Sequence, residues 1–231
     1  MDLKKKVYIH GGGKISNVFI HVGLPKTATT FLQKEIFAKF EDVNYIGRWN
    51  IKTELKKDTI NIISDETLYG CADATYNNNI DIRQIILDKL KLMYPNAKII
   101  VGIREKEKWK KSLYNHYVKA GGYLPYDKWL TKINVDYFDM ESYIKDLKKK
   151  FKLVYVYNFD DIKNQNKFVE NLCNFMELPI PMFTNKLHNV SLTKMQLKIL
   201  RILNRVIYSK EYNPKGIIPH MILIKIFRKI R

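Results

Sequence analysis

The stretch Asn17-Val-Phe-Ile-His-Val-Gly-Leu-Pro-Lys-Thr-Ala-Thr-Thr-Phe-Leu32 decides the fold. Its apolar and β-branched residues from Val18 to Val22 predict a short buried strand. A glycine and a proline then break the pattern, and hydroxyl residues lead into a helical pattern from Phe31 to Phe40. The first amides of a helix have no partners within the helix and carry the positive end of its dipole. With Lys26 beside them, the sequence predicts a site for a phosphate or sulfate group.

The loop differs from the Walker A motif G-x-x-x-x-G-K-[ST], because the second glycine is missing and Lys26 follows Gly23 by three residues. Gly23-Leu-Pro-Lys-Thr-Ala-Thr-Thr30 instead resembles the 5′-phosphosulfate loop, G-x-P-K-[TS]-[AG]-T-[TS], of sulfotransferases that use 3′-phosphoadenosine 5′-phosphosulfate (PAPS). The resemblance implies that Lys26 is catalytic and supports the bridging oxygen. It also implies a donor-binding set of Pro25, Lys26, Thr27, Ala28, Thr29 and Thr30.

A second motif strengthens this resemblance. Residues 97–103 predict a strand, Arg104 stands at its end, and residues 105–120 predict a helix. The family pattern R-[DN]-P-x-x-R-x-x-S-x-Y-x-H appears here as Arg104-Glu-Lys-Glu-Lys-Trp-Lys-Lys-Ser112-Leu-Tyr-Asn-His116, with lysine and tryptophan at the Pro and inner Arg positions. The resemblance implies that Arg104 and Ser112 hold the 3′-phosphate, and a guanidinium with a hydroxyl suits a phosphate chemically.

The implied transfer needs a base for the proton of the acceptor. Glu66 is the first candidate, because residues 60–63 predict a strand and ligands of open α/β sheets bind at strand exits. Capping of the next helix is an equally open role for Asp65 and Glu66. His116 is the second candidate, one helical turn after the serine of the second motif. His21, inside the first strand, is predicted to be a core histidine.

Other segments complete the expected domain. The aromatic stretch 121–139 is predicted to be irregular and resembles the segment that borders the acceptor, although a small local core explains it equally well. Asn189 and Ser191 match an N-x-S that lies near the nucleotide in the family, whereas capping of the following helix by Ser191 or Thr193 is the alternative. The remaining patterns predict a polar connector over 41–57, helices over 81–94, 140–151, 165–177 and 193–208, and a strand over 153–157.

Composition indicates one α/β domain over residues 1–231, with a central, mostly parallel sheet flanked by helices, a polar lead-in (1–16) and a basic amphipathic tail (216–231). The net charge of +18 attracts polyanions in general, but no nucleic-acid-binding motif is present. The two cysteines form no framework pattern, and no signal peptide or membrane-spanning run is recognised. We therefore expect a cytoplasmic protein, with peripheral contact of the tail to the inner membrane face as a further hypothesis. The alternative for the tail is a last helix packed on the domain.

The expected reaction moves a sulfuryl group from PAPS to an acceptor hydroxyl or amine and releases adenosine 3′,5′-bisphosphate (PAP). Resemblance to bacterial-type carbohydrate sulfotransferases favours a glycan or glycolipid acceptor. No cluster of metal ligands stands out, so no metal is expected. The alternatives are a P-loop kinase of a small molecule and a non-catalytic binder of polyanions.

Overall fold

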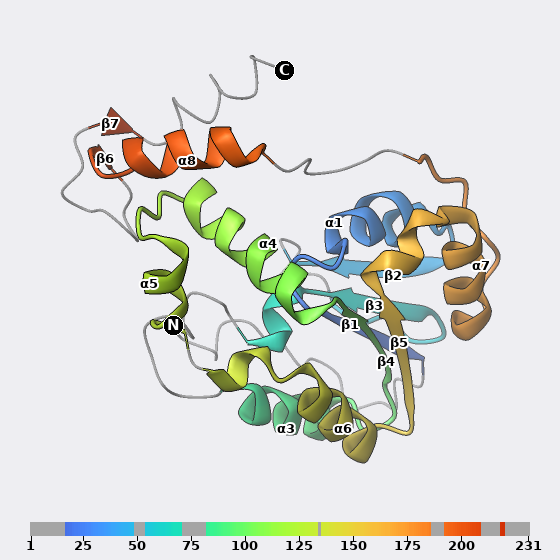
Figure 1. Cartoon of the computed structure of the whole chain (residues 1–231). Helices are drawn as coiled ribbons and strands as arrows, with labels where there is room; N and C mark the ends of the chain where they lie inside the picture. The colour runs from blue at the N-terminus through green and yellow to red at the C-terminus, as the bar shows by residue number, and fades with distance from the viewer. Residues whose placement is uncertain are drawn as a thin grey trace. The chain divides into compact units, whose positions relative to one another are not determined.

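The computed structural model describes residues 17–48, 54–70, 82–133, 135–185, 192–208 and 218–219 (Figure 1). The chain forms two compact units. The first comprises residues 1–104 and 134–188, and the second comprises residues 105–133 and 189–231. The predicted lead-in 1–16 and most of the tail 216–231 lie outside the described residues.

The first unit is built on a five-stranded sheet in which every strand is parallel to its neighbours. Its spatial order is β2-β3-β1-β4-β5. The strands are β1 (Val18–Gly23), β2 (Val43–Gly47), β3 (Ile60–Ser64), β4 (Lys98–Ile103) and β5 (Leu153–Asn158). The predicted α/β class and parallel sheet are confirmed, and all the strand exits lie along one edge of the sheet, as ligand sites in such folds require.

Strand β2 corrects the prediction of a polar connector over residues 41–57. It forms one edge of the sheet, and most of its side chains are only half-buried. The buried Asn44 is accommodated because its amide donates to Asn61 Oδ1 and to the carbonyl of Glu54, both at 2.8 Å. A polar edge strand of this kind lacks the apolar run by which buried strands are recognised.

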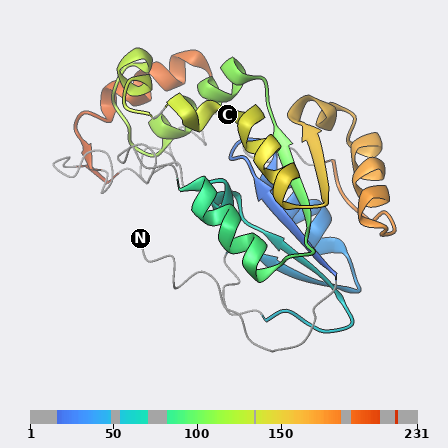
Figure 2. The same ribbon diagram turned by 90° about the horizontal axis from the view of Figure 1, so that it is seen from below.

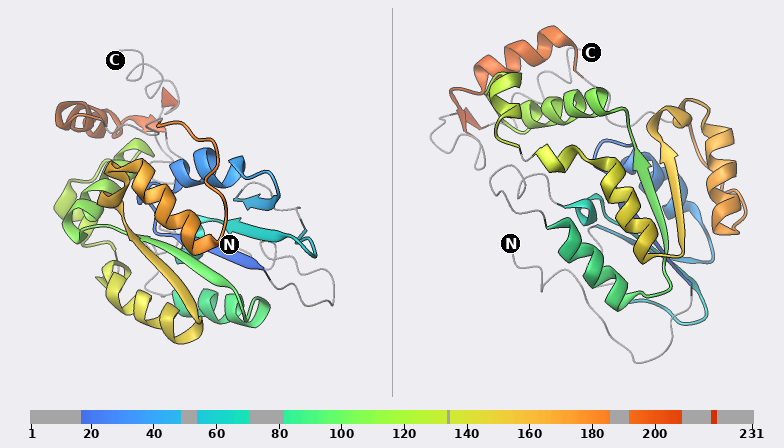
Figure 3. Two further views of the ribbon diagram at one scale, coloured as in Figure 1. Left: turned by 90° about the vertical axis from the view of Figure 1, so that its right-hand side faces the viewer. Right: turned by 60° about the horizontal axis from the view of Figure 1, so that its bottom comes forward.

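Helices cover both faces of the sheet (Figures 1 and 2). The described residues of this unit form the helices and helical turns α1 (Thr29–Phe31), η2 (Leu32–Ile36), η3 (Phe37–Lys39), η4 (Glu66–Tyr69), α3 (Arg83–Met93), η5 (Val135–Phe138), α6 (Met140–Lys150), η6 (Phe159–Lys163) and α7 (Gln165–Met176). The segment α1–η3 and helix α7 pack together on one face in a core that includes Leu32, Ile62 and Leu172, while α3 and α6 lie on the other face (Figure 3). This packing holds in place both β1 and the segment α1–η3, which lie before and after the loop that carries Lys26.

The second unit contains α4 (Lys106–Lys119), α5 (Tyr126–Leu130), α8 (Lys194–Leu203) and the short parallel pair β6 (Ile207–Tyr208) and β7 (Ile218–Pro219). Helix α8 ends earlier than the predicted residue 208, because the buried Asn204 follows it and donates to the carbonyls of Val118 and Gly122, both at 2.8 Å. Helix α5 was not predicted within the stretch 121–139. Among the described residues, no helix is long and apolar enough to cross a membrane.

Candidate active site

The loop between β1 and α1 has an unusual backbone. Gly23, Lys26 and Ala28 have φ values of 74°, 71° and 65°, in the left-handed region. For lysine and alanine this conformation costs roughly 1–2 kcal/mol each. Alternation of left- and right-handed residues turns successive amides toward one concavity that suits an anion. The strain is therefore located where the sequence predicts the phosphosulfate site.

Gly23 also allows close approach of a second element. A Cβ atom at this position would lie 2.8 Å from Glu66 Cα and 2.9 Å from Glu66 Cβ, closer than packing permits. The turn η4 therefore lies directly against the end of β1. This contact brings Glu66 next to the loop that carries Lys26, as expected for two strand exits at one sheet edge.

Hydrogen bonds hold the loop from within the unit. Tyr157 Oη donates to the carbonyl of Thr27 at 3.0 Å, and Thr27 Oγ1 donates to the carbonyl of Leu24 at 2.7 Å. Arg104 Nη1 donates to the carbonyl of Lys26 at 3.1 Å. A Cβ at Gly102 would clash with the Tyr157 ring and with Thr27 Oγ1, so the glycine in β4 makes room for this arrangement.

The threonines of the loop differ in their contacts. The hydroxyl of Thr27 is already used by Leu24, whereas the buried Thr29 Oγ1 has no hydrogen-bond partner within the described residues. A buried hydroxyl without a partner is costly unless a ligand or a water satisfies it. Pro25 and Thr30 are half-buried, and Pro25 contributes no amide donor. The loop thus retains donor capacity for an anion.

Lys26 is the charged centre of this arrangement. Burial lowers the pKa of Lys26, the neighbouring Arg104 guanidinium lowers it further, and the Glu66 carboxylate opposes both effects. The three charges therefore act on one another at the same strand exits. An anion bound here would stabilise the protonated lysine, because it would replace the solvation that burial removes.

The carboxylate of Glu66 is held by two donors. Arg48 Nη1, just after β2, is 3.3 Å from Glu66 Oε1, and Gln33 Nε2 donates to Glu66 Oε2 at 3.4 Å. Its neighbour Asp65 caps η4 by accepting from the amide of Thr67 at 2.8 Å. The capping alternative is thus confirmed for Asp65, while the side chain of Glu66 faces charged and polar groups.

A buried polar network lies beneath the loop, and the sequence did not predict it. His21 is fully buried, with Nδ1 2.8 Å from Ser64 Oγ and Nε2 3.3 Å from Tyr157 Oη. Since Tyr157 donates to the loop, the network assigns a neutral His21 that donates from Nε2 and accepts at Nδ1. Gln33 Nε2 is 3.2 Å from Ser64 Oγ, which extends the network toward Glu66. In the sequence, this network is indicated by a polar residue in each of two apolar strands, His21 in β1 and Ser64 in β3.

Burial lowers the pKa of His21 to about 3. The prediction of a core histidine is therefore confirmed, and this side chain is not a base at neutral pH. Cys173 is likewise buried in the core on α7.

The residues of the second motif belong to different units. Arg104 closes the first unit and stacks 4.0 Å above the Phe159 ring. Ser112 and His116 lie one turn apart on α4 in the second unit, where Ser112 is half-buried and His116 is exposed. Asn189 and Ser191 lie outside the described residues, and the alternative cap is observed, since Thr193 accepts from the amide of Gln196. The predicted 3′-phosphate site stays a prediction.

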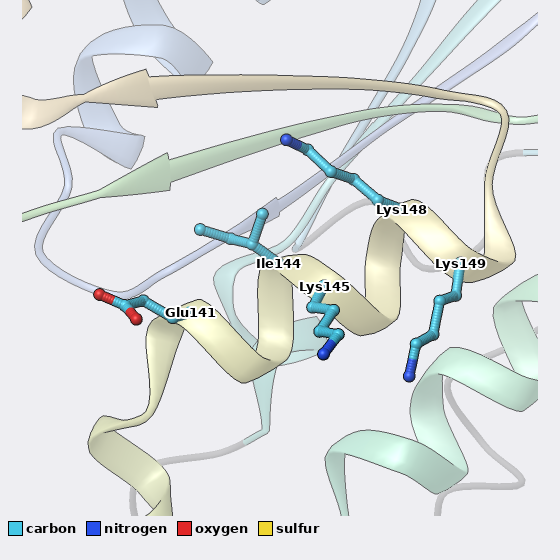
Figure 4. A pocket seen from close by; sticks show the side chains of 5 residues that line it. All are labelled: Glu141, Ile144, Lys145, Lys148 and Lys149. Carbon is cyan, nitrogen blue, oxygen red and sulfur yellow. The ribbon is translucent and has the colours of Figure 1, made fainter.

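A surface hollow of about 500 Å³ lies along α6 and is separate from these residues. Glu141, Ile144, Lys145, Lys148 and Lys149 line it (Figure 4). Its lining contains none of the strand-exit groups around Lys26. In the described part of the chain, no group of three or more His, Cys, Asp or Glu side chains could hold a metal ion.

Comparison with known proteins connects this geometry with a family. Residues 19–169 match the family model described as a sulfotransferase domain, a span that includes the loop, Glu66 and Arg104. The chain belongs to the sulfotransferase domain family. This membership confirms the resemblance drawn from the two motifs and identifies the protein as a sulfotransferase, in place of a small-molecule kinase or a non-catalytic binder.

The fold of this sulfotransferase is similar to that of a solved bacterial structure. The sulfotransferase from Alicyclobacillus acidocaldarius aligns with a TM-score of 0.52 at 14% sequence identity, over 74% of this chain and 85% of that chain. At this identity the likeness concerns the fold alone. A sequence comparison with curated proteins gave no match.

Proposed function

We propose that this sulfotransferase takes the sulfuryl group from PAPS and transfers it to a hydroxyl group of a glycan or glycolipid. The observation that carries the proposal is the half-buried Lys26 on a loop with left-handed residues, with Glu66 and Arg104 at the adjacent strand exits. Membership in the family supports PAPS as the donor. The loop amides and the hydroxyl of Thr29 provide the anion contacts that a 5′-phosphosulfate requires.

Lys26 stabilises the negative charge that develops on the leaving oxygen. In the step, the bond between sulfur and the 5′-phosphate oxygen breaks, a bond between sulfur and the acceptor oxygen forms, and PAP leaves. Charge accumulates on the bridging oxygen, and a fixed cation in a water-poor site lowers the barrier most effectively there. Contacts from Tyr157 and Arg104 to the loop carbonyls keep the lysine in place before donor binding.

Glu66 receives the proton of the acceptor hydroxyl. Its side chain is 29% exposed, so a substrate can reach it, and Arg48 and Gln33 fix the orientation of its carboxylate. His116 is the second candidate, and it is exposed on α4. A variant pair separates the two: Glu66→Gln should lower kcat strongly if Glu66 is the base, whereas His116→Gln should then leave most of the activity.

The 3′-phosphate of the donor is assigned to Arg104 and Ser112, with Asn189 and Ser191 as further nucleotide contacts. The guanidinium of Arg104 donates to the Lys26 carbonyl and stacks on the Phe159 ring. These two contacts orient the guanidinium before the nucleotide binds. ATP carries no 3′-phosphate, so this group should decide nucleotide choice. Calorimetry tests it directly: PAP should bind without magnesium, and Arg104→Ala should weaken PAP binding more than it weakens adenosine 5′-phosphosulfate binding.

The acceptor is tested by incubating the enzyme with radiolabelled PAPS and cell-envelope fractions. Label in polysaccharide or glycolipid supports a glycan acceptor, while label only in small soluble molecules or protein contradicts it. Binding of ATP with magnesium, but not of PAP, would contradict the assignment of the donor. The tail over residues 216–231 would suit a membrane-borne acceptor because it alternates apolar and basic residues.

A further inference from the structure

Helix α8 presents a row of exposed apolar side chains. Met195, Ile199, Ile202 and Val206 are 72%, 43%, 50% and 52% exposed. Their spacing of four, three and four residues places them on one side of the helix and of the turn that follows it. Isolated exposed apolar residues are common, but a continuous row of this kind marks a surface that another phase or partner covers.

The opposite side of α8 packs against other residues of the second unit. Leu200 and Asn204 are buried, and Asn204 anchors the end of the helix to the carbonyls that end α4. The apolar row is therefore not the core-facing side of the helix. It is a second apolar side, separate from the one that carries the buried Leu200.

A row of cations runs beside the apolar row. Lys194, Lys198, Arg201 and Arg205 repeat with the same spacing, one position earlier in the sequence, and residues 192–208 contain no Asp or Glu. Within the described residues, no carboxylate forms an ion pair with Lys194, Lys198 or Arg201. This surface therefore suits a partner that has an apolar interior and a negatively charged outer layer.

We infer that α8 docks on the surface of an anionic lipid bilayer. The apolar row would enter the boundary between headgroups and acyl chains, while the neighbouring cations would contact the lipid phosphates. An anionic bilayer complements the cations of α8, whereas the protein's own tail would repel them. Residues 220–231 contain no acid and four cations, Lys225, Arg228, Lys229 and Arg231. The inference concerns a surface of the described second unit and does not depend on the identity of the sulfated acceptor.

Vesicle sedimentation with the full chain tests the inference. Binding to vesicles of phosphatidylglycerol and phosphatidylcholine should exceed binding to phosphatidylcholine alone at least about tenfold. The double variant Ile199→Asn/Ile202→Asn should bind the anionic vesicles at least about tenfold less, because it removes apolar burial at unchanged net charge. Leu92→Asn is the matched control, since Leu92 is an isoleucine-sized side chain that is 84% exposed on α3, and it should change binding less than twofold.

A second measurement locates the contact on α8. Ile199→Trp should gain fluorescence quenching by lipids with brominated acyl chains, whereas Leu92→Trp should not. Unchanged vesicle binding by the double variant, or no quenching at position 199 while the protein sediments with vesicles, would overturn the inference. So would loss of a dimer in the double variant with vesicle binding intact, because the row would then be an interface between copies. Circular dichroism checks that each variant is folded.

Discussion

The buried histidine beneath the loop should make the protein sensitive to acid. His21 is neutral in the folded state, with a pKa of about 3, whereas an unfolded chain protonates its histidines near pH 6.5. Between these two values the unfolded state binds more protons than the folded state, so stability rises with pH in this window and falls as pH decreases. His21 alone should therefore remove about 2 kcal/mol of unfolding free energy between pH 7 and pH 5.

Urea unfolding at the two pH values measures this effect in the wild type and in His21→Gln. The variant should be less stable at pH 7, because a bond to Ser64 or Tyr157 is lost. It should also lose about 2 kcal/mol less than the wild type on going to pH 5. His116→Gln is the matched control, since that histidine is exposed on α4 and should leave most of the pH slope in place. Equal pH slopes in the wild type and His21→Gln would show that His21 is not the source of the acid sensitivity.

Three further predictions concern the loop and its surroundings. Gly23→Ala should cost more than about 2 kcal/mol and most of the activity, because Gly23 has a positive φ and its Cβ would lie 2.8 Å from the backbone Cα of Glu66. Gly47→Ala should cost less in thermal unfolding, because φ is not positive there and the nearest atom, Tyr45 Oη at 2.9 Å, is the end of a side chain that can shift. Gln33→Leu should lower kcat severalfold with little change in the KM for the donor, because the Glu66 carboxylate loses the hydrogen bond that orients it. Changes of equal size in kcat and in the KM for the donor would contradict this. Because the pKa of Lys26 is lowered, kcat/KM should start to fall at a lower pH than the one at which an ordinary lysine loses its proton. In Lys26→Arg this fall should be absent, because arginine stays protonated.

The sequence was sufficient for the elements that carry strong apolar patterns. The inner strands β1, β3 and β4 were predicted because parallel strands covered on both faces form continuous apolar runs. The edge strand β5 was predicted because its run of β-branched and aromatic residues is typical of a strand. Strand β2 was missed because an edge strand is polar enough to resemble a connector. The length of α8 was overestimated because its periodicity continues past Asn204, whereas the helix ends where the Asn204 side chain donates to the Val118 carbonyl of α4.

For the site, the sequence could identify chemical types but not their mutual contacts. The loop, Glu66 and Arg104 were recognised as strand exits, and the register of the parallel sheet brings them together at one edge. The support of the loop by Tyr157 could not be predicted, because this contact joins residues 130 positions apart. The placement of Ser112 against the 3′-phosphate stays a prediction, as does the contribution of Asn189 and Ser191.

In the proposed reaction, Lys26 provides the catalytic charge for sulfuryl transfer from PAPS. The most direct measurement compares transfer of radiolabelled sulfate from PAPS by the wild type, Lys26→Ala and the control Lys34→Ala, which makes the same charge change at an exposed position in η2. We expect kcat to fall at least about 100-fold in Lys26→Ala, with PAP binding retained, and to stay near the wild-type value in Lys34→Ala. Transfer by Lys26→Ala at the wild-type rate would contradict this role of Lys26.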